Sequence, residues 1–136
     1  MKDIIEYKEG ELMNILDDYF KLFDESRYSE ESFQKLNALF SDEIEFVLNN
    51  KTFKGKEAWK QFVKSVYTTN KDLKHMHNGW TENEDGSFET HWAVCGNRYE
   101  TGVYTQEGKD IARLDANGKI AYLENQPKDD QLFSNQ

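Results

Sequence analysis

The first third of the chain carries hydrophobic residues at the three- and four-residue spacing of a helix that buries one face. From Glu11 onward, apolar side chains recur on one side, while Asp17, Asp18 and Lys21 fill the other. The recurring apolar positions are Leu12, Ile15, Leu16, Tyr19, Phe20 and Phe23. This spacing predicts a long amphipathic helix whose apolar stripe faces the core.

Two further helical patterns follow. Ser29, with Glu30 and Glu31 behind it, has the residue types of an N-cap and an acidic first turn. The apolar positions of this second helix are Phe33, Leu36 and Phe40. A third helix is predicted after Gly55 and is expected to end near Asn70. Its apolar stripe consists of Ala58, Trp59, Phe62, Val63, Val66 and Tyr67.

The remaining segments alternate with the period of strands. Ile44, Phe46 and Leu48 alternate with other residues, and Asn49-Asn50 supplies a turn before a short strand at 52–53. After Asp72, stretches rich in Val, Ile, Thr, Tyr and Trp predict a meander of about four strands. Turn signals separate them at Asp85-Gly86, at either Gly96-Asn97 or 100–102, and at Asn117-Gly118. Helices first and an antiparallel sheet afterwards predict an α+β domain in which helices cover one face of the sheet.

Length and charge narrow the class of protein. A chain of 136 residues suits one domain spanning 1–136, with about 1–10 and 127–136 expected to be peripheral or partly disordered. The net charge of −9 disfavours nucleic-acid binding. The single cysteine cannot close an internal disulfide, the acidic start does not suit a signal peptide, and no apolar run reaches about 18 residues. We therefore expect a cytoplasmic protein that binds neither membranes nor nucleic acid.

Five motifs in order resemble the SnoaL-like branch of the nuclear transport factor 2-like superfamily. They are the long opening helix, LFSDEIEF at 39–46, FKGKEAW at 53–59, the histidine-bearing strand, and GKDIARLDANGKI at 108–120. The resemblance spans roughly residues 11–125. It implies a cone-shaped α+β barrel, with three N-terminal helices packed against a strongly curved, mostly antiparallel sheet. It also implies an apolar pocket at the open end and often a homodimer. The family includes isomerases, dehydratases and cyclases as well as non-catalytic binding domains, so fold alone does not settle function.

The segment 73–97 carries all three histidines, two of the three tryptophans and the only cysteine. It is predicted to form a hairpin, and side chains alternate across a strand. An even turn at Asp85-Gly86 would place Phe88 opposite Asn83, Trp92 opposite Gly79 and Val94 opposite His77. The first face would then hold His75, His77, Gly79, Thr90, Trp92 and Val94. The second would hold Met76, Asn78, Trp80, His91, Ala93 and Cys95.

We interpret the first face as a pocket wall. Phe88, Trp92 and Val94 make it apolar, and two imidazoles on it could act as acid, base or hydrogen-bond donor. Packing histidines with satisfied hydrogen bonds are the alternative for both rings. On the outer face, Trp80 and Ala93 could serve a homodimer interface.

His75 and His77 point the same way, which also suggests a metal site. Metal ions in proteins usually take three or four ligands, and His91 has the wrong parity to add one. We therefore predict no metal and no other cofactor. Cys95 has no base near it except His91 on its own face, so we interpret it as a buried thiol and not a nucleophile.

The closing hairpin adds a carboxylate. An even turn at Asn117-Gly118 would place Asp110 on one face, where burial would raise its pKa and suit a general base. Its neighbours on that face would be Ala112, Leu114, Ala121 and Leu123, with Ile111, Arg113, Ile120, Tyr122 and Glu124 on the other. An exposed aspartate at a strand edge is the alternative. The resemblance implies that this strand lies beside the pocket.

Tyr19 completes the catalytic candidates. In ketosteroid isomerases, which the resemblance brings in, a tyrosine of the first helix stabilises an oxyanion against an aspartate base, and Tyr19 with Asp110 could imitate that pair. Tyr19 also lies in the apolar stripe, where a core role would suit it equally. Trp59 is expected to be a core residue or a shelf for a ligand.

Three functions are compatible with the sequence. The first is a small-molecule-binding domain with an apolar, aromatic-lined pocket for a small apolar or aromatic molecule. The second is an isomerase, dehydratase or cyclase that works without a cofactor and uses His75, His77, Asp110 and Tyr19. The third is a protein-interaction module with a filled interior and an apolar outer surface near Trp80 and His91.

Overall fold

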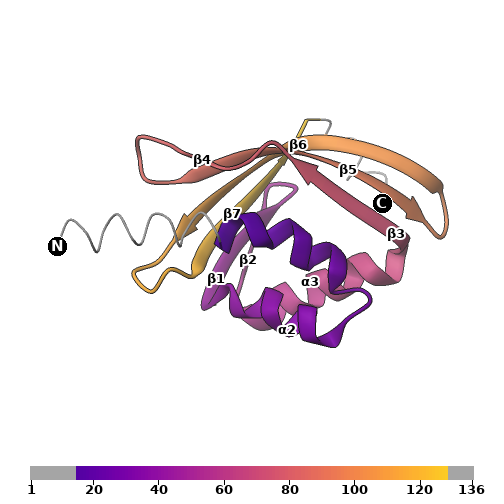
Figure 1. Ribbon diagram of the computed structural model, residues 1–136, viewed down its shortest axis with the longest axis horizontal. Coiled ribbons are helices and arrows are strands. Elements are labelled where there is room, and N and C mark those ends of the chain that lie inside the picture. Colours follow the sequence, from indigo (N-terminus) through magenta and orange to yellow (C-terminus); the bar gives the residue numbers. More distant parts are fainter. Residues whose placement is uncertain (1–14, 129–136) are drawn as a thin grey trace.

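The computed structural model describes residues 15–128 and confirms the α+β class. The first helix is described from residue 15 to residue 25 and is unlabelled in Figure 1. The labelled elements are α2 (Glu30–Ala38), β1 (Phe40–Leu48), β2 (Lys51–Lys54), α3 (Lys56–Thr69), β3 (Asn70–His77), β4 (Thr81–Glu82), β5 (Phe88–Arg98), β6 (Gly102–Leu114) and β7 (Ile120–Pro127). The predicted helix start at Glu11 and most of the predicted peripheral ends lie outside the described residues.

The first two helices follow the predicted spacing. Leu16, Tyr19, Phe20 and Phe23 are buried in the first helix, as a stripe with period 3.6 requires. The Ser29 side chain accepts a hydrogen bond from the backbone N–H of residue 32 at 3.1 Å and caps α2 as predicted. The second helix is shorter than expected, because the residue at position 40 begins β1.

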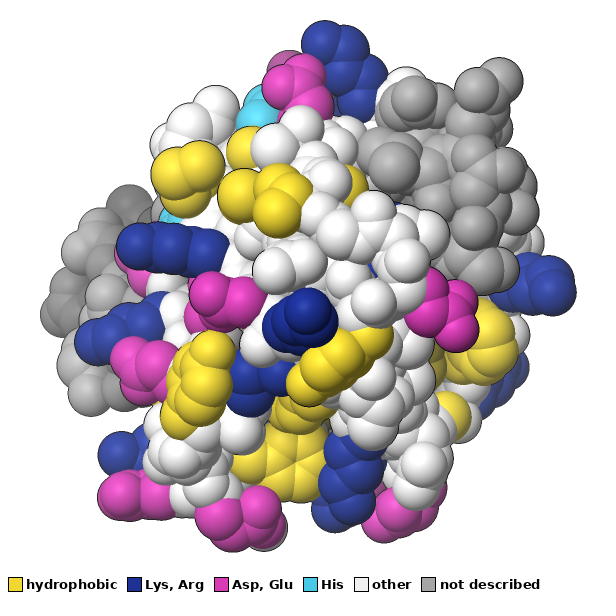
Figure 2. Space-filling model, turned by 90° about the vertical axis from the view of Figure 1, so that its right-hand side faces the viewer, with side chains coloured by type: hydrophobic (Ala, Val, Ile, Leu, Met, Phe, Trp, Pro, Cys, Tyr) yellow, Lys and Arg dark blue, Asp and Glu magenta, His cyan; other side chains and the backbone are white. Residues whose placement is uncertain are grey.

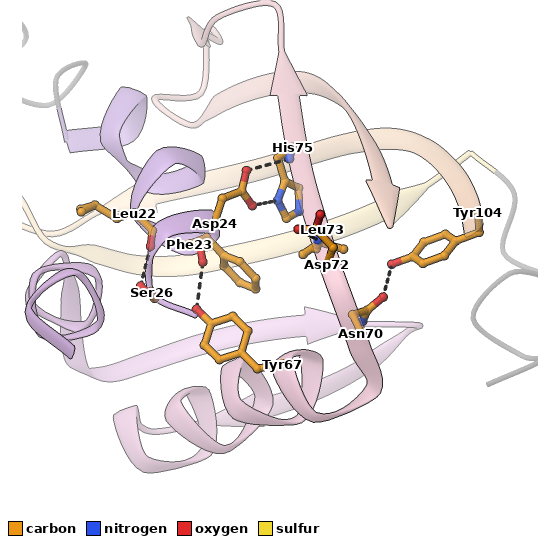
Figure 3. Close-up of polar contacts among 10 residues, drawn as sticks. All are labelled: Leu22, Phe23, Asp24, Ser26, Tyr67, Asn70, Asp72, Leu73, His75 and Tyr104. Atoms are coloured by element: carbon orange, nitrogen blue, oxygen red, sulfur yellow. Dashed lines mark hydrogen bonds and ion pairs between the residues drawn. The ribbon is translucent and has the colours of Figure 1, made fainter. Parts of the chain in front are cut away.

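Helix α3 agrees with its prediction and is fixed to the first helix. Gly55, with φ of 98°, precedes it, and Trp59 and Val63 are buried. The Tyr67 hydroxyl donates to the carbonyl of Phe23 at 2.8 Å, which joins α3 to the end of the first helix (Figure 3). In the described part of the chain, no helix is both long and apolar enough to cross a membrane.

The strands form one mixed sheet in the order β2-β1-β7-β6-β5-β3, with β4 beside β5. Strands β1 and β7 are parallel, whereas the other recorded pairs are antiparallel. Asn49 and Asn50 turn the β1–β2 hairpin with φ values of 53° and 65°, which suits a two-residue turn of primed type. The sheet curves over the helices, which lie together on its inner side (Figure 1). The core therefore lies between the helices and the inner face.

The first hairpin keeps the predicted faces with a different register. His77 pairs with Trp92 and His75 with Val94, two residues away from the predicted pairing. A shift of two preserves alternation, so these four residues still share the inner face. The glycine opposite Trp92 is Gly108 on β6 and not Gly79. A Cβ at Gly108 would lie 2.8 Å from the indole, so the expected close approach of tryptophan and glycine does occur.

The prediction for Trp80 was wrong. Residues 78–80 are not extended strand, and Gly79 has φ of 92°. This break resets the alternation, so Trp80 turns inward and is only 4% exposed, stacked on Phe20. His91 and Cys95 do face outward. Cys95 is exposed, so the expectation of a buried thiol was also wrong.

The two later hairpins compare differently with their predictions. Strand β5 runs through Gly96-Asn97 and turns at 99–101, which agrees with the second of the two predicted turns, at 100–102. In the closing hairpin, Asp110 pairs with Asn125 as the predicted faces require, but the register shifts next to Leu114. That irregularity turns Ile120 into the core, where its side chain is fully buried, and not onto the outer face as expected.

The chain end also differs from its prediction. Pro127 is the last residue of β7 and pairs with Gly108. The backbone N–H of Lys128 then donates to the carbonyl of Glu107 at 2.9 Å. The expected peripheral tail therefore does not begin at residue 127, and residues 129–136 lie outside the described part.

Candidate functional site

The first helix, α3 and the inner face of the sheet surround a cavity of about 250 Å³. Its wall is rich in aromatic side chains, which are Tyr19, Phe20, Phe23, Phe46, Trp59, Phe62, Trp92 and Tyr104. Apolar cavities of about 150 Å³ can hold a benzene molecule. The present cavity therefore has room for a molecule of about one or two rings.

Asp110 contributes a buried carboxyl group to this wall. It lies on β6 between β5 and β7 and is 2% exposed. Its Oδ1 accepts hydrogen bonds from the indole N–H of Trp92 at 2.9 Å and from the amide of Asn125 at 3.0 Å. Burial raises its pKa to about 7, although the Trp92 hydrogen bond, the charge of His75 and the Asn125 hydrogen bond oppose that rise. Asp110 can therefore exchange a proton near neutral pH.

His75 lines the same cavity and is held by a carboxylate from the first helix. Asp24 accepts from the backbone N–H of His75 at 2.7 Å and contacts its ring Nδ1 at 2.7 Å (Figure 3). Because a carboxylate accepts, Nδ1 carries the proton and Nε2 is the nitrogen left for other partners. Phe20 stacks on the imidazole at 5.1 Å between ring centroids, and Phe23 meets it edge-on at 5.2 Å. These contacts fix the orientation of the ring.

Tyr19 lies in the aromatic wall as well as in the core. Its ring centroid is 6.2 Å from that of Trp59. Burial raises the pKa of its hydroxyl well above the usual value, and the negative charges of Asp110 and Asp24 raise it further. The phenol therefore stays protonated at neutral pH and can act only as a neutral hydrogen-bond donor or acceptor.

The structure brings six of the eight predicted site residues to the cavity. These are Tyr19, Trp59, His75, Trp92, Val94 and Asp110. His77, the last residue of β3, packs on Phe20 with ring centroids 5.1 Å apart and lines a separate hollow, and its Nδ1 accepts from the N–H of Gly79 at 3.1 Å. Phe88 is buried at the start of β5, outside the residues that line the cavity. The two predicted histidines therefore both lie on the inner side of β3, but only His75 lines the cavity.

Sequence reasoning missed four polar residues of the cavity or its first neighbours. They are Asp24, Arg98, Gln106 and Asn125. Asp24 follows Phe20 by four positions, a spacing that places both on one helix face. Arg98 extends the alternation of Trp92 and Val94 by two more steps, so the same parity argument could have found it.

The described residues contain no cluster of potential metal ligands. Within residues 15–128, no group of three or more His, Cys, Asp and Glu side chains is arranged to hold a metal ion. The inner histidine and the two inner aspartates are occupied with the hydrogen bonds given above.

Comparison with known proteins adds the family. No protein-family model matches the chain, and no curated protein matches it. Among solved structures, an NTF2-like protein of unknown function from Exiguobacterium sp. 255-15 is 56% identical, with a TM-score of 0.82, covering 85% of this chain and 98% of that one.

Two more distant structures share the fold. A candidate scytalone dehydratase from Novosphingobium aromaticivorans DSM 12444 is 15% identical, with a TM-score of 0.74 and coverage of 95% and 89%. A candidate polyketide cyclase from Xanthomonas campestris pv. campestris is 14% identical, with a TM-score of 0.68 and coverage of 87% and 90%. With the 56% identical relative as the decisive match, the chain belongs to the nuclear transport factor 2-like (NTF2-like) family.

Proposed function

We propose that this protein binds a small, largely apolar or aromatic molecule in its cavity and catalyses proton transfer on it. The observation that carries the proposal is that Asp110, with a pKa of about 7, and His75, oriented by Asp24, line one aromatic cavity. General acid–base catalysis needs positioned groups that exchange protons near the working pH. The reaction would be an isomerisation, a dehydration or a cyclisation.

The proposed step begins with ionised Asp110. Its carboxylate takes a proton from a carbon next to a carbonyl group, and the electron pair of the broken C–H bond forms the C=C bond of an enolate. The carbonyl oxygen gains negative charge and accepts a hydrogen bond from Tyr19 or from protonated His75. For isomerisation, Asp110 returns the proton to a different carbon. For dehydration, a hydroxyl group leaves as water with a proton from Nε2 of protonated His75.

The buried carboxyl group is what favours catalysis over binding alone. An aromatic wall would suffice to hold an apolar molecule. Burying an ionisable group costs free energy unless the group is paired or hydrogen-bonded, and strongly shifted pKa values gather at functional sites. The candidate dehydratase and cyclase named above share the fold and are compatible with this class of chemistry.

The interaction-module hypothesis receives less support. It required a filled interior and an apolar outer surface near Trp80 and His91. The interior instead contains a cavity of about 250 Å³. Trp80 belongs to the buried core, and His91 is exposed.

The test is solvent-deuterium exchange. The protein would be incubated in D₂O with 2-tetralone, 2-indanone and phenylacetone, and loss of the proton signal next to each carbonyl would be followed by NMR. Wild-type protein should accelerate exchange of at least one compound above the buffer rate, and Asp110→Asn should reduce this acceleration by about 10²- to 10⁴-fold. Asp18→Asn, at an exposed position of the first helix, is the matched control and should exchange like wild type. Exchange at the buffer rate with all three compounds, or equal rates for wild type and Asp110→Asn, would contradict the proposal.

A further inference from the structure

A second polar group lies at the other end of the cavity. Asp110 pairs with Thr90 on β5, whereas Arg98 is the last residue of that strand and pairs with Gly102. Residues 90, 92, 94, 96 and 98 alternate onto the inner face. Asp110 and Arg98 therefore mark opposite ends of one cavity wall, and both line the cavity.

Within the described part of the chain, Arg98 has neither the carboxylate partner of Arg113 nor the backbone carbonyl partner of Arg27. Arg113 forms an ion pair with Asp85 at 2.7 Å, and Arg27 donates to the backbone carbonyl of Asn70. Among residues 15–128, no carboxylate lies within ion-pair distance of Arg98. In a chain of net charge −9, a half-buried arginine without a carboxylate is a conspicuous place for an anion.

The guanidinium group of Arg98 packs against the ring of Tyr104. Its central carbon lies 3.8 Å from the centroid of the Tyr104 ring, so the guanidinium group stacks on that ring. The Tyr104 hydroxyl donates to Oδ1 of Asn70 at 3.0 Å (Figure 3). A Cβ at Gly96 would lie 2.5 Å from the Tyr104 ring, so glycine makes room for this ring. Tyr104 therefore holds Arg98 in place in the cavity wall.

Gln106 is a second, independent indication that a ligand oxygen could accept hydrogen bonds at this end of the cavity. It lies two positions beyond Tyr104 on β6, lines the cavity and is 6% exposed. Its amide nitrogen is buried and has no hydrogen-bond partner among the described residues. A buried donor without an acceptor costs about 1 to 3 kcal/mol, so a ligand that brings an acceptor oxygen would relieve that cost.

The described outer surface at the Arg98 end of the cavity is mixed in polarity and charge. Figure 2 shows the right-hand end of Figure 1, where β5 meets β6, and there small groups of hydrophobic side chains alternate with acidic and basic ones.

We propose that the ligand is an aromatic carboxylate whose carboxylate group binds Arg98 and Gln106 while its ring lies along the wall towards Asp110. This inference rests on the proposed function and names its class of substrate. A carboxylate matches the planar fork of a guanidinium group. A singly charged group suits this site better than a phosphate dianion, because one arginine supplies one positive charge and Asp110 and Asp24 are nearby.

The test compares an acid with its neutral isostere. Binding of 2-naphthoate and 2-naphthamide to the full chain would be measured by isothermal titration calorimetry at about pH 8, where the acid is ionised. Hydrogen bonds to charged groups contribute about 1.5 to 3 kcal/mol, so naphthoate should bind about 10- to 100-fold more tightly than the amide. Arg98→Gln should remove this preference, and a far-UV circular dichroism spectrum and a urea midpoint like those of wild type would show that the variant folds.

Two further variants sharpen the result. Arg98→Lys should recover only part of the preference, because an ammonium group lacks the planar fork. Arg113→Gln, which removes an exposed arginine, should bind both compounds like wild type. Equal binding of acid and amide by wild type, or full acid preference in Arg98→Gln, would overturn the inference and leave the proposed function standing. Preference for the acid without deuterium exchange in any compound would support the inference and contradict the proposed function. Absence of binding by both compounds would overturn the inference.

Discussion

Replacing Asp110 with asparagine should stabilise the protein, and the gain should grow with pH. Asparagine keeps an oxygen that can accept from Trp92 and Asn125, but it cannot ionise. The folded protein raises the Asp110 pKa from 3.8 to about 7, so folding favours the protonated form. The stability linked to this proton is present in full below about pH 4 and is lost as pH rises through about 7.

The size of the effect follows from the change in pKa. Each tenfold change in an acid constant corresponds to about 1.4 kcal/mol, so a rise from 3.8 to about 7 corresponds to about 4 kcal/mol. The unfolding free energy of Asp110→Asn should therefore nearly equal that of wild type at about pH 4 and exceed it by about 4 kcal/mol at about pH 8.

Urea denaturation followed by tryptophan fluorescence would measure this difference, since Trp59, Trp80 and Trp92 are all buried. Other titrating groups are common to both proteins, so subtraction isolates Asp110. Asp18→Asn, at an exposed position, should show no pH-dependent difference from wild type. A difference between Asp110→Asn and wild type that does not change from about pH 4 to about pH 8, or that falls, would refute the reasoning.

Three other substitutions test neighbouring parts of the account. Trp92→Phe removes the indole donor, so the pKa of Asp110 should rise further above 7. The measurement is the difference in unfolding free energy between Trp92→Phe and the double variant Trp92→Phe/Asp110→Asn, plotted against pH. Its midpoint should lie at a higher pH than in the wild-type background, and an unchanged or lower midpoint would contradict the role of the Trp92 hydrogen bond. Gly108→Ala would place a methyl group 2.6 Å from a carbonyl oxygen of β7, so the unfolding free energy in urea should fall by about 1 to 3 kcal/mol, and no loss would contradict the packing described. Ser29→Ala removes the cap of α2 and should cost about 1 kcal/mol of unfolding free energy, whereas Ser29→Thr should keep most of it; equal losses in both would contradict a capping role.

Periodicity predicted the helices because their burial depends on local spacing alone. The stripe containing Leu16 and Phe20 and the stripe containing Trp59 and Val63 lie buried as expected. The inner position of Asp110 followed from strand alternation, because the β6–β7 pairing is regular from Gly108 to Arg113.

Predictions failed where the backbone departs from its regular period. Trp80 follows Gly79, whose φ of 92° interrupts the strand, and a left-handed residue cannot be located from alternation. Ile120 follows a register shift next to Leu114, and such irregularities depend on how the sheet curves over the helices.

The missing parts of the site depend on contacts between distant segments. The bond from Asp24 to His75 joins residues 51 positions apart, and nothing in either local pattern pairs them. The unsatisfied amide of Gln106 is recognisable only once its surroundings are known. Residue types therefore suggested the proposed acid–base chemistry and alternation could have located Arg98, while the contacts of Asp24 and Gln106 required the structure.

The most direct test of the central claim is a titration of Asp110 itself. Carbon-13 NMR of the aspartate carboxyl carbons would be recorded against pH, with Asp110→Asn used to assign the resonance. The account predicts that this carboxyl titrates near pH 7. A midpoint at or below about 5, within the usual range of aspartates in folded proteins, would contradict the claim that Asp110 exchanges protons at neutral pH.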